Sequence, residues 1–221
     1  MQALTVLWIV FVTNSFNLLD NMDGLCAGTV SLTSGVLALV ALAAGQPPLA
    51  LALAALCGAS LGFLRYNLAP ATIFLGDAGS MFVGFLMACL TVATTYYQYR
   101  ESALSVGVPL MILAVPLYDT ATVFWIRLRE GRGLLTGDTS HFSHRLVDLG
   151  MSRRQAVATI HLAALAIALP AAVLRRLSDA EGIFLIAQAV LILTLIALLE
   201  RAGAQRARGR REDGGEGGGD A

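Results

Sequence analysis

The sequence contains no lysine and few charged residues of any kind. All fifteen basic residues are arginines, fifteen acids balance them, and charged residues make up only 14% of the 221-residue chain, against about a quarter in an average soluble domain. Hydrophobic residues reach 57%, and the mean hydropathy is +0.71. This composition excludes an ordinary soluble protein. It predicts an integral protein of the lipid bilayer, for which we expect no nucleic-acid partner.

Cysteine is also scarce, because the chain has only Cys26, Cys57 and Cys89, all in apolar stretches. An odd number provides no disulfide framework, and a thiol in an apolar stretch behaves as a small hydrophobic side chain. We therefore expect three packing residues. The start of the chain also lacks the basic region and the cleavage site of a signal peptide, so none is expected.

Long apolar segments, by contrast, are abundant. A helix needs roughly 20 residues to cross about 30 Å of hydrocarbon, and seven segments approach this length. The sequence therefore predicts an all-α, polytopic bundle of about seven transmembrane helices over residues 1–200, followed by a disordered, Gly-rich and charged tail over residues 201–221. The apolar segments are residues 2–19, 26–44, 49–65, 80–97, 104–128, 155–174 and 182–200.

The distribution of arginine predicts the orientation of this bundle. Two longer connections, residues 66–79 and 129–154, fall on the same face as the tail. Twelve of the fifteen arginines belong to this face, and the other three are Arg100, Arg175 and Arg176. The positive-inside rule then makes the face with the long polar loops and the C-terminus cytoplasmic.

The stretch NSFNLLDNMDGL places three asparagines and two acids at the cytoplasmic end of the first segment. Asn14, Asn17, Asp20 and Asp23 recur every third residue, and on a helix the first three share a broad face. Gly24 predicts a helix end, after which Asp23 can turn back toward the same pocket. Neighbouring acids without a base favour a cation or a proton between them, and hard oxygen ligands suit Mg²⁺. Capping and solvated acids at an interfacial helix end explain the spacing equally well.

A second polar element, IFLGDAGSMFVGF, leads into the fourth segment. Asp77 is either an N-cap that accepts from the Ser80 amide, which is the simpler interpretation, or a metal-bridging carboxylate at a helix N-terminus that attracts phosphate. Phe74 is either an interface aromatic or a surface on which a base stacks. The motif alone leaves these alternatives open.

The longest cytoplasmic loop contains a third element, HFSHRL. His141 and His144 are three residues apart and share a helix face with Arg145 beside them, which provides donors for phosphate oxygens. An amphipathic helix at the headgroup level explains the same residues. His161, alone in the sixth segment, is expected to pack and to hydrogen-bond to a neighbouring helix. Asp119 is a functional candidate, because an acid inside a membrane segment requires a partner.

All three polar elements fall on one face of the membrane, and together they carry a resemblance. NSFNLLDNMDGL, FLGDAGS and HFSHRL, in this order, make the chain similar to the polyprenyl-phosphate N-acetylhexosamine-1-phosphate transferases, glycosyltransferase family 4, from residue 1 to about residue 200. The first pattern is highly specific, the second moderately so, and the third is weak by itself. The combination is what indicates the family.

The resemblance implies an enzyme of the bacterial cytoplasmic membrane. Such an enzyme transfers a sugar-1-phosphate, here GlcNAc-1-phosphate, from a UDP-sugar to undecaprenyl or another polyprenyl phosphate and releases UMP. Mg²⁺, or alternatively Mn²⁺, would bridge the diphosphate, because attack of one anion on another requires charge neutralisation more than a strong base. The UDP-sugar, the polyprenyl phosphate and the bilayer are the expected partners, and a homodimer is left open.

The resemblance also assigns roles to the polar residues. Asp77 would be a magnesium ligand, and Asn14 and Asn17 would line the metal and sugar-phosphate site. Asn21, Met22 and Asp23 would contact the uracil end, with Phe74 stacked on the base. The His loop would face the diphosphate through His141, His144 and Arg145. The catalytic residues would be Asp20, Asp23, Asp77 and His141, and the remaining substrate contacts Asn21, Met22, Phe74, His144 and Arg145.

The sequence departs from the family pattern in two ways. Members carry an Asp-Asp pair on a span before the first motif and have ten or eleven spans, so we expect an N-terminally truncated piece, and a non-catalytic fragment or subunit is one alternative. DNMDGL and HFSHRL also differ from the DGLDGL and consecutive histidines of the UDP-MurNAc-pentapeptide branch, which favours the UDP-GlcNAc branch over phospho-MurNAc-pentapeptide transfer. A transporter is disfavoured because no inverted repeat is visible.

Overall fold

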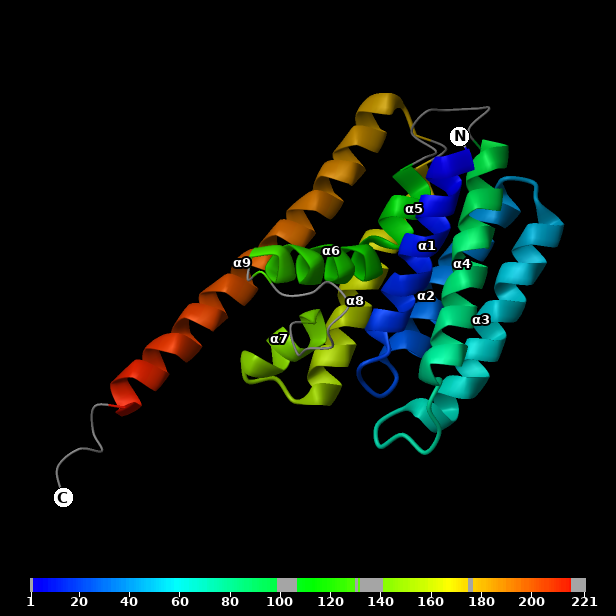
Figure 1. Ribbon diagram of the computed structural model, residues 1–221. Coiled ribbons are helices and arrows are strands. Elements are labelled where there is room, and N and C mark those ends of the chain that lie inside the picture. Colours follow the sequence, from blue (N-terminus) through cyan, green and yellow to red (C-terminus); the bar gives the residue numbers. More distant parts are fainter. Residues whose placement is uncertain (1, 99–106, 130, 132–140, 175–176, 216–221) are drawn as a thin grey trace, which may run out of the picture.

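The protein is described by a computed structural model that covers residues 2–98, 107–129, 131, 141–174 and 177–215, with side chains described as far as Thr95 in the fourth helix and Gly203 in the last. These residues form helices and connections without a strand, which confirms the predicted all-α class (Figure 1). The helices are α1 (Gln2–Leu19), α2 (Leu25–Ala43), α3 (Pro47–Asn67), α4 (Gly76–Gln98), α5 (Gly107–Ile112), α6 (Ala114–Arg129), α7 (Phe142–Asp148), α8 (Arg153–Ala171) and α9 (Asp179–Gly215).

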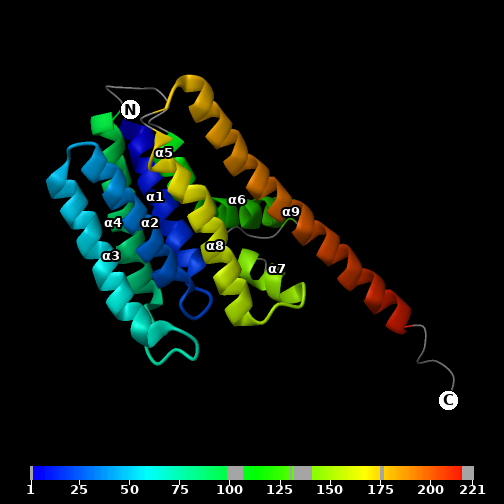
Figure 2. The ribbon, with the colours of Figure 1, turned by 180° about the vertical axis from the view of Figure 1, so that it is seen from behind.

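Six of the described helices are long and apolar enough to cross a membrane: α1, α2, α3, α4, α8 and α9. They confirm a polytopic membrane bundle. The predicted fifth segment, residues 104–128, differs from the expectation because it is divided into the short α5 and the separate α6. In both ribbon views α6 runs across the bundle instead of along it (Figures 1 and 2).

Proline explains this division. Pro116 has no N–H to bond to the carbonyl four residues earlier, and its ring crowds that carbonyl. The chain turns at Leu113, between the two helices. The hydrogen bonds that remain, from the Leu113 amide to the Pro109 carbonyl and from the Leu117 amide to the Leu113 carbonyl, are 2.9 and 3.0 Å long. The apolar segment therefore keeps its local bonds but changes direction.

Helix α2 lies at the centre of the bundle and contacts α1, α3, α4, α5 and α8. Small hydroxyl residues let its neighbours approach, and each hydroxyl bonds within the helix; Thr29 Oγ1 donates to the Leu25 carbonyl at 2.8 Å and Ser34 Oγ to the Val30 carbonyl at 2.6 Å. The ring of His161 packs on Gly28, and its Nε2 lies 3.2 Å from the Leu25 carbonyl. The prediction of a packed histidine is thus confirmed.

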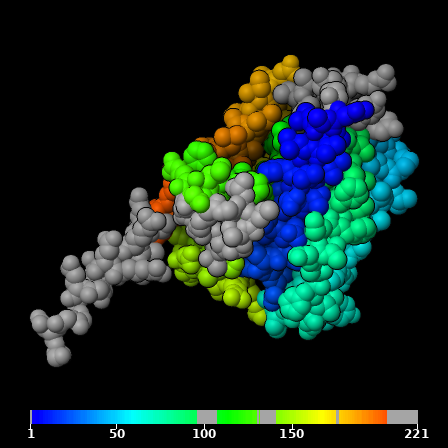
Figure 3. Space-filling view, in the orientation of Figure 1, coloured from blue at the N-terminus to red at the C-terminus, as the bar shows by residue number. Residues whose placement is uncertain are grey.

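Helices α1 and α4 form an antiparallel pair that positions the candidate site, and Figure 3 shows them side by side on one face. Trp8 Nε1 donates to Thr91 Oγ1 at 3.0 Å near one end. Closer to the other end, a Cβ on Gly84 would lie 2.9 Å from the Thr13 carbonyl oxygen, so only glycine permits this approach. One turn farther toward this end, the polar side chains of α1 and α4 therefore come into contact.

The connections predicted to share one face do gather at one end of the molecule. The turn after α1, the loop before α4 and helix α7 lie together at the lower end in Figure 1. The last helix differs from the expectation, because α9 continues to Gly215 through residues predicted to be disordered. Alanine, arginine, glutamine and glutamate favour helix even where no core can form. Residues 216–221 of the predicted tail lie outside the described residues.

Candidate active site

The contact between α1 and α4 brings Asn17 to the start of α4. Its Nδ2 donates to Asp77 Oδ1 at 3.2 Å and lies 3.0 Å from Ser80 Oγ. Ser80 Oγ donates in turn to the Gly76 carbonyl at 3.0 Å. Asp77 is thus an exposed residue in the first turn of α4, with its carboxylate facing Asn17, and not the cap before the helix that the simpler interpretation predicted.

Asp20 is the second carboxylate of this cluster. Burial raises the pKa of the Asp20 carboxyl above its usual range, and the negative charge of Asp77 raises it further. Neither carboxylate forms an ion pair within the described part of the chain. A half-buried carboxyl beside a second carboxylate, with no ion pair to either among the described residues, forms a site that a cation would stabilise.

The donor set suits a hard divalent cation that shares its coordination with a ligand. Mg²⁺ in proteins is held through one or two carboxylates plus substrate phosphates. Among the described residues no group of three or more His, Cys, Asp or Glu side chains could hold a metal alone. Asp20, Asp77 and the amide oxygen of Asn17, after rotation of the amide, are the oxygen donors that such a cation would find here. Asn14, the other predicted ligand, donates from Nδ2 to the Val10 carbonyl along its own helix at 2.8 Å.

Asp23 does not return to the pocket of Asp20 as expected. Its Oδ2 accepts from the Ala71 amide at 3.0 Å, in the loop before α4. Beside it, the Gly24 amide donates to Asn67 Oδ1 at 3.1 Å, and Asn67 Nδ2 donates to the Ile73 carbonyl at 2.9 Å. Gly24 has φ +76, the left-handed region that glycine adopts at little cost. The turn after α1 therefore fixes the loop that precedes α4.

The predicted uracil contacts belong to this turn and to this loop. Phe74 follows the fixed part of the loop and is 70% exposed, with its ring open to a ligand. Met22 is half-buried and packs against the core. Asn21 Nδ2 donates to the Leu18 carbonyl at 2.8 Å, and its Oδ1 accepts from Ser143 Oγ in α7 at 2.6 Å.

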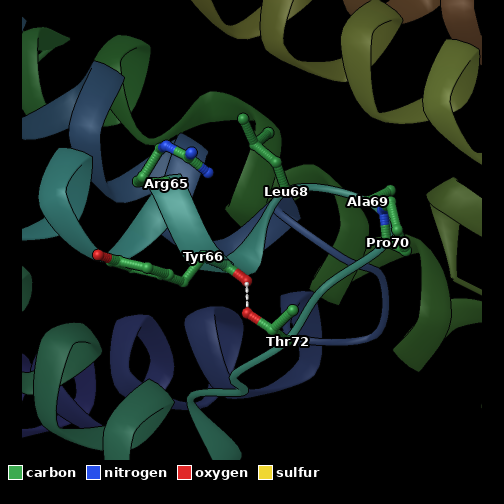
Figure 4. Close-up of a pocket in the computed structure, with 6 residues that line it drawn as sticks. All are labelled: Arg65, Tyr66, Leu68, Ala69, Pro70 and Thr72. Carbon is green, nitrogen blue, oxygen red and sulfur yellow. Dashed lines mark hydrogen bonds between the residues drawn. The ribbon is translucent and has the colours of Figure 1, made fainter.

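A depression of about 510 Å³ lies on another side of the same loop (Figure 4). Thr72 Oγ1 donates to the Tyr66 carbonyl at 3.1 Å and closes the loop there. None of the predicted site residues lines this depression, so it is not part of the candidate site. The lining residues are Arg65, Tyr66, Leu68, Ala69, Pro70 and Thr72.

The start of α7 is held by Asp119, which α6 carries across the bundle. Asp119 Oδ2 lies 3.1 Å from His141 Nδ1, and Oδ1 accepts from the Phe142 amide at 2.6 Å. Asp119 is only 1% exposed, and His141 is also buried. The expectation that Asp119 needs a partner is met by the His loop. A carboxylate at Nδ1 fixes the tautomer and leaves Nε2 as the nitrogen for a ligand.

The other two residues of the His loop differ in their surroundings. His144 is half-exposed, and burial lowers the pKa of its imidazole, with the charges of His141 and Arg153 lowering it further. Arg145 Nη2 donates to Thr122 Oγ1 at 3.0 Å, and its Nε lies 3.1 Å from Glu200 Oε1 in α9. Arg145 therefore has protein partners where the resemblance predicts a diphosphate.

Sequence reasoning missed four polar residues that support this site: Asn67, Thr122, Ser143 and Glu200. Asn67 is almost fully buried, and it stands out in the sequence only as a polar residue that ends an apolar segment. Glu200 is the last residue of the predicted segment 182–200 and the one acid in it. Thr122 and Ser143 carry no sequence signal, because threonine and serine are common in membrane helices and loops.

Comparisons with known proteins agree with the three motifs. Residues 1–95 match the model of glycosyl transferase family 4. The chain is 34% identical over 194 residues to the "Probable undecaprenyl-phosphate N-acetylglucosaminyl 1-phosphate transferase" of Bacillus subtilis, covering 88% of this chain and 54% of the relative. It is 32% identical over 227 residues to the decaprenyl-phosphate N-acetylglucosaminephosphotransferase of Mycolicibacterium smegmatis, covering 91% and 55%.

A third relative is the undecaprenyl-phosphate alpha-N-acetylglucosaminyl 1-phosphate transferase of Escherichia coli K12, 32% identical over 165 residues, which cover 73% of this chain and 44% of the relative. The chain spans about half the length of the curated relatives it matches. All three are named for N-acetylglucosamine, the sugar of the predicted branch. The motifs, the helical membrane fold and these matches agree, and the chain therefore belongs to glycosyl transferase family 4.

Proposed function

We propose that the protein transfers GlcNAc-1-phosphate from UDP-GlcNAc to a polyprenyl phosphate such as undecaprenyl phosphate and releases UMP. The observation that carries this proposal is the meeting of Asn17, Asp20 and Asp77 where α1 ends and α4 begins. These acids lack a basic partner among the described residues, and they lie where a helix of apolar residues reaches its polar end. The names of the relatives supply the substrate class.

The reaction exchanges one diphosphate (phosphoanhydride) bond for another, and the phosphate esters to the sugar and to the lipid stay intact. An oxygen of the polyprenyl phosphate attacks the phosphorus that bears the sugar, and the bond from this phosphorus to the bridging oxygen breaks. UMP leaves with that oxygen. Mg²⁺, or Mn²⁺ in its place, would neutralise charge on the phosphates when bound to Asp20, Asp77 and Asn17. The protein's own task is to hold both anions in line, because positioning and charge stabilisation dominate phosphoryl transfer.

The other predicted residues take places around these phosphates. Phe74, exposed on its loop, offers a face for the uracil base, and Asp23 orients that loop through the Ala71 amide. His141, fixed by Asp119 at Nδ1, is assigned to the diphosphate through Nε2. His144 stands beside it on the half-exposed side of α7.

Orientation in the membrane follows from the arginines. The helix ends and loops on the predicted face of the candidate site are rich in arginine, and they include Arg65, Arg127, Arg129, Arg145 and Arg153. The positive-inside rule assigns such a face to the cytoplasm. We therefore propose a bacterial inner-membrane enzyme whose UDP-sugar arrives from the cytoplasm. The described site lies within one chain, so the proposal does not depend on a homodimer.

The test is UMP release by membranes that contain this chain, supplied with UDP-GlcNAc, undecaprenyl phosphate and Mg²⁺. The Asp77→Asn variant serves as the inactive comparison, and Asp179→Asn, a change of the same charge at the exposed start of α9, serves as the matched control. Release that requires Mg²⁺ and disappears only in Asp77→Asn supports the proposal. A folded chain that releases no UMP contradicts it for these 221 residues.

Ligand binding gives a second measurement on the purified chain. A ligand that binds only the folded state stabilises it by RT ln(1 + [L]/Kd), about 2.7 kcal/mol at a hundredfold excess over Kd. UDP-GlcNAc with Mg²⁺ should therefore raise the unfolding temperature more than either one alone. Equal shifts with and without Mg²⁺ would argue against a shared metal and diphosphate site.

A further inference from the structure

The last transmembrane helix carries one acid whose side chain is buried. Helix α9 is largely exposed along its apolar stretch, yet the Glu200 side chain is only 9% exposed. A carboxylate near the membrane is costly unless it has partners, and such residues are usually functional. Glu200 contributes nothing to the contact between the acids of α1 and α4, so its burial requires a separate explanation.

The partners of Glu200 come from two other elements. Its Oε1 lies 3.1 Å from Arg145 Nε in α7, a charge contact, and its Oε2 accepts from the Tyr118 hydroxyl in α6 at 2.8 Å. Each oxygen of one carboxylate is thus directed to a different helix. The hydrogen bond from Tyr118 to a charged acceptor adds a directional contact to the attraction between Arg145 and Glu200.

Arg145 extends this link back to α6 and to the start of α7. Its Nη2 donates to Thr122 Oγ1 at 3.0 Å, and its Cζ lies 6.0 Å from the centre of the Phe142 ring. The Tyr118 ring packs edge-on against the same Phe142 ring, with centroids 5.7 Å apart. Tyr118 and Arg145 therefore contact Glu200 directly, and Thr122 and Phe142 support Arg145 in turn.

We propose that Glu200 is a positioning residue for the active site: through Arg145 and Tyr118 it locks α7 against α6 and so sets where His141 and His144 stand. This inference deepens the proposed function and rests on it for the catalytic meaning of the two histidines. Its structural part, that α7 is ordered by a carboxylate of α9, stands on the contacts alone.

The short length of α7 explains why this helix needs the contact of Glu200 with Arg145 and Tyr118, which we call the lock. Helix α7 has only seven residues, and a helix this short is not stable without tertiary contacts. Asp119 fixes its first residues, and Ser143 Oγ bonds to Asn21 Oδ1. The Glu200 contact acts one turn later, at Arg145, and completes the support of the helix.

Hydrogen exchange of the purified chain tests this lock without any requirement for turnover. In Glu200→Gln, the amides of residues 142–148 should exchange about tenfold faster, because local opening becomes easier when a buried ion pair is lost. Asp179→Asn changes the same charge at the other end of α9 and should leave these amides unchanged. Unchanged exchange in Glu200→Gln overturns the proposal.

Glu200→Gln could unfold the whole chain, and faster exchange in the central α2 would reveal this. A second variant then tests the proposal. Tyr118→Phe removes one hydrogen bond to Glu200 and leaves the charge contact with Arg145 in place. We expect a smaller increase, about threefold, confined to α7. The absence of an increase in α7 for Tyr118→Phe would then overturn the proposal.

Kinetics separate positioning from substrate binding. In Glu200→Gln, kcat should fall about tenfold while KM for UDP-GlcNAc stays within about twofold, because displaced histidines affect the reacting geometry and not the uracil end. The double variant with Arg145→Gln should be no slower than Glu200→Gln alone if the two residues act as one unit. A raised KM with unchanged kcat contradicts the proposal. If the unmodified chain shows no turnover, the proposed function fails while the exchange result still decides the lock.

Discussion

Two regions of the molecule handle their charges in opposite ways. Where α1 meets α4, Asp77 is exposed, Asp20 is half-buried, and neither is paired with a base among the described residues. Around α7, Asp119 is buried and Glu200 is largely so, and each contacts a histidine or arginine side chain. The carboxylates of the first region remain available to a ligand, whereas those of the second are engaged by side chains of the protein.

The difference separates the residues that should act on substrate from those that should support them. Isolated charges cost free energy when buried, so a fully paired set is typical of structural support. Acids that remain unpaired at a polar helix end are kept at some cost and indicate a binding site. Substitutions can test whether a residue acts on substrate, as expected at the contact between α1 and α4, or supports the structure, as expected around α7.

The largest effect is expected for Asp77→Asn. It removes one of the two carboxylates proposed for the cation, and we expect Mg²⁺-dependent turnover to fall about a thousandfold. The unfolding temperature should be unchanged or raised, because repulsion with Asp20 disappears. UMP release and thermal unfolding in detergent measure the two effects. Activity near that of the unmodified chain would remove Asp77 from the site.

The opposite result is expected for Asp119→Ala. The change leaves buried His141 and the Phe142 amide without their carboxylate, and breaking such a buried pair costs about 3 kcal/mol. Equilibrium unfolding of the purified chain in detergent measures this loss. Asp179→Asn provides the control, and an unchanged unfolding free energy for Asp119→Ala would place Asp119 outside the supporting region.

A moderate effect on binding alone is expected for Phe74→Ala. Stacking of a base on an aromatic ring contributes about 1–3 kcal/mol, so KM for the UDP-sugar should rise about tenfold. Stability should not change, because Phe74 is largely exposed. Phe85, which is also exposed but lies farther along α4, provides a matched Phe→Ala control. An equal KM in both variants would indicate that Phe74 only faces the interface.

The smallest effect concerns pH. Because the pKa of His144 is lowered in the folded chain, the unfolded chain binds more protons between that lowered value and the ordinary value of about 6.5. Stability should therefore rise as pH increases through this window and fall as pH decreases. His144→Gln should flatten the profile. A variant with the same pH dependence as the unmodified chain would show that another group is responsible.

The sequence predicted much of the bundle but less of the contacts around α7. Long apolar runs specify membrane helices directly, because length and hydropathy suffice. The bend at Leu113 was missed although Pro109 and Pro116 lie near it, because proline is tolerated in membrane helices and its position alone does not predict a break. As a result, the direction of α6 and the place of Asp119 were not predictable.

The candidate site shows the same limit. Asn17 and Asp77 were assigned to one site from their motifs, and the structure joins them across 60 residues of sequence. Asp23 and Arg145 were assigned to ligands, and the structure gives them the Ala71 amide and Glu200. A motif identifies which residues matter, but a bond to a backbone amide or to a distant helix depends on how loops and helices meet.

The close approach at Gly84 has a consequence for the acids near the membrane surface. Gly84 lies eight residues into α4, about 12 Å below its first residue at 1.5 Å per residue, and it touches the backbone of α1 at Thr13. The backbones of α1 and α4 therefore meet four residues before Asn17 and seven residues after Asp77 in the sequence, so the approach at Gly84 helps to set the spacing of the two helices near these side chains. A bilayer of different thickness that tilts α1 against α4 would therefore change the width of the gap between Asn17 and Asp77.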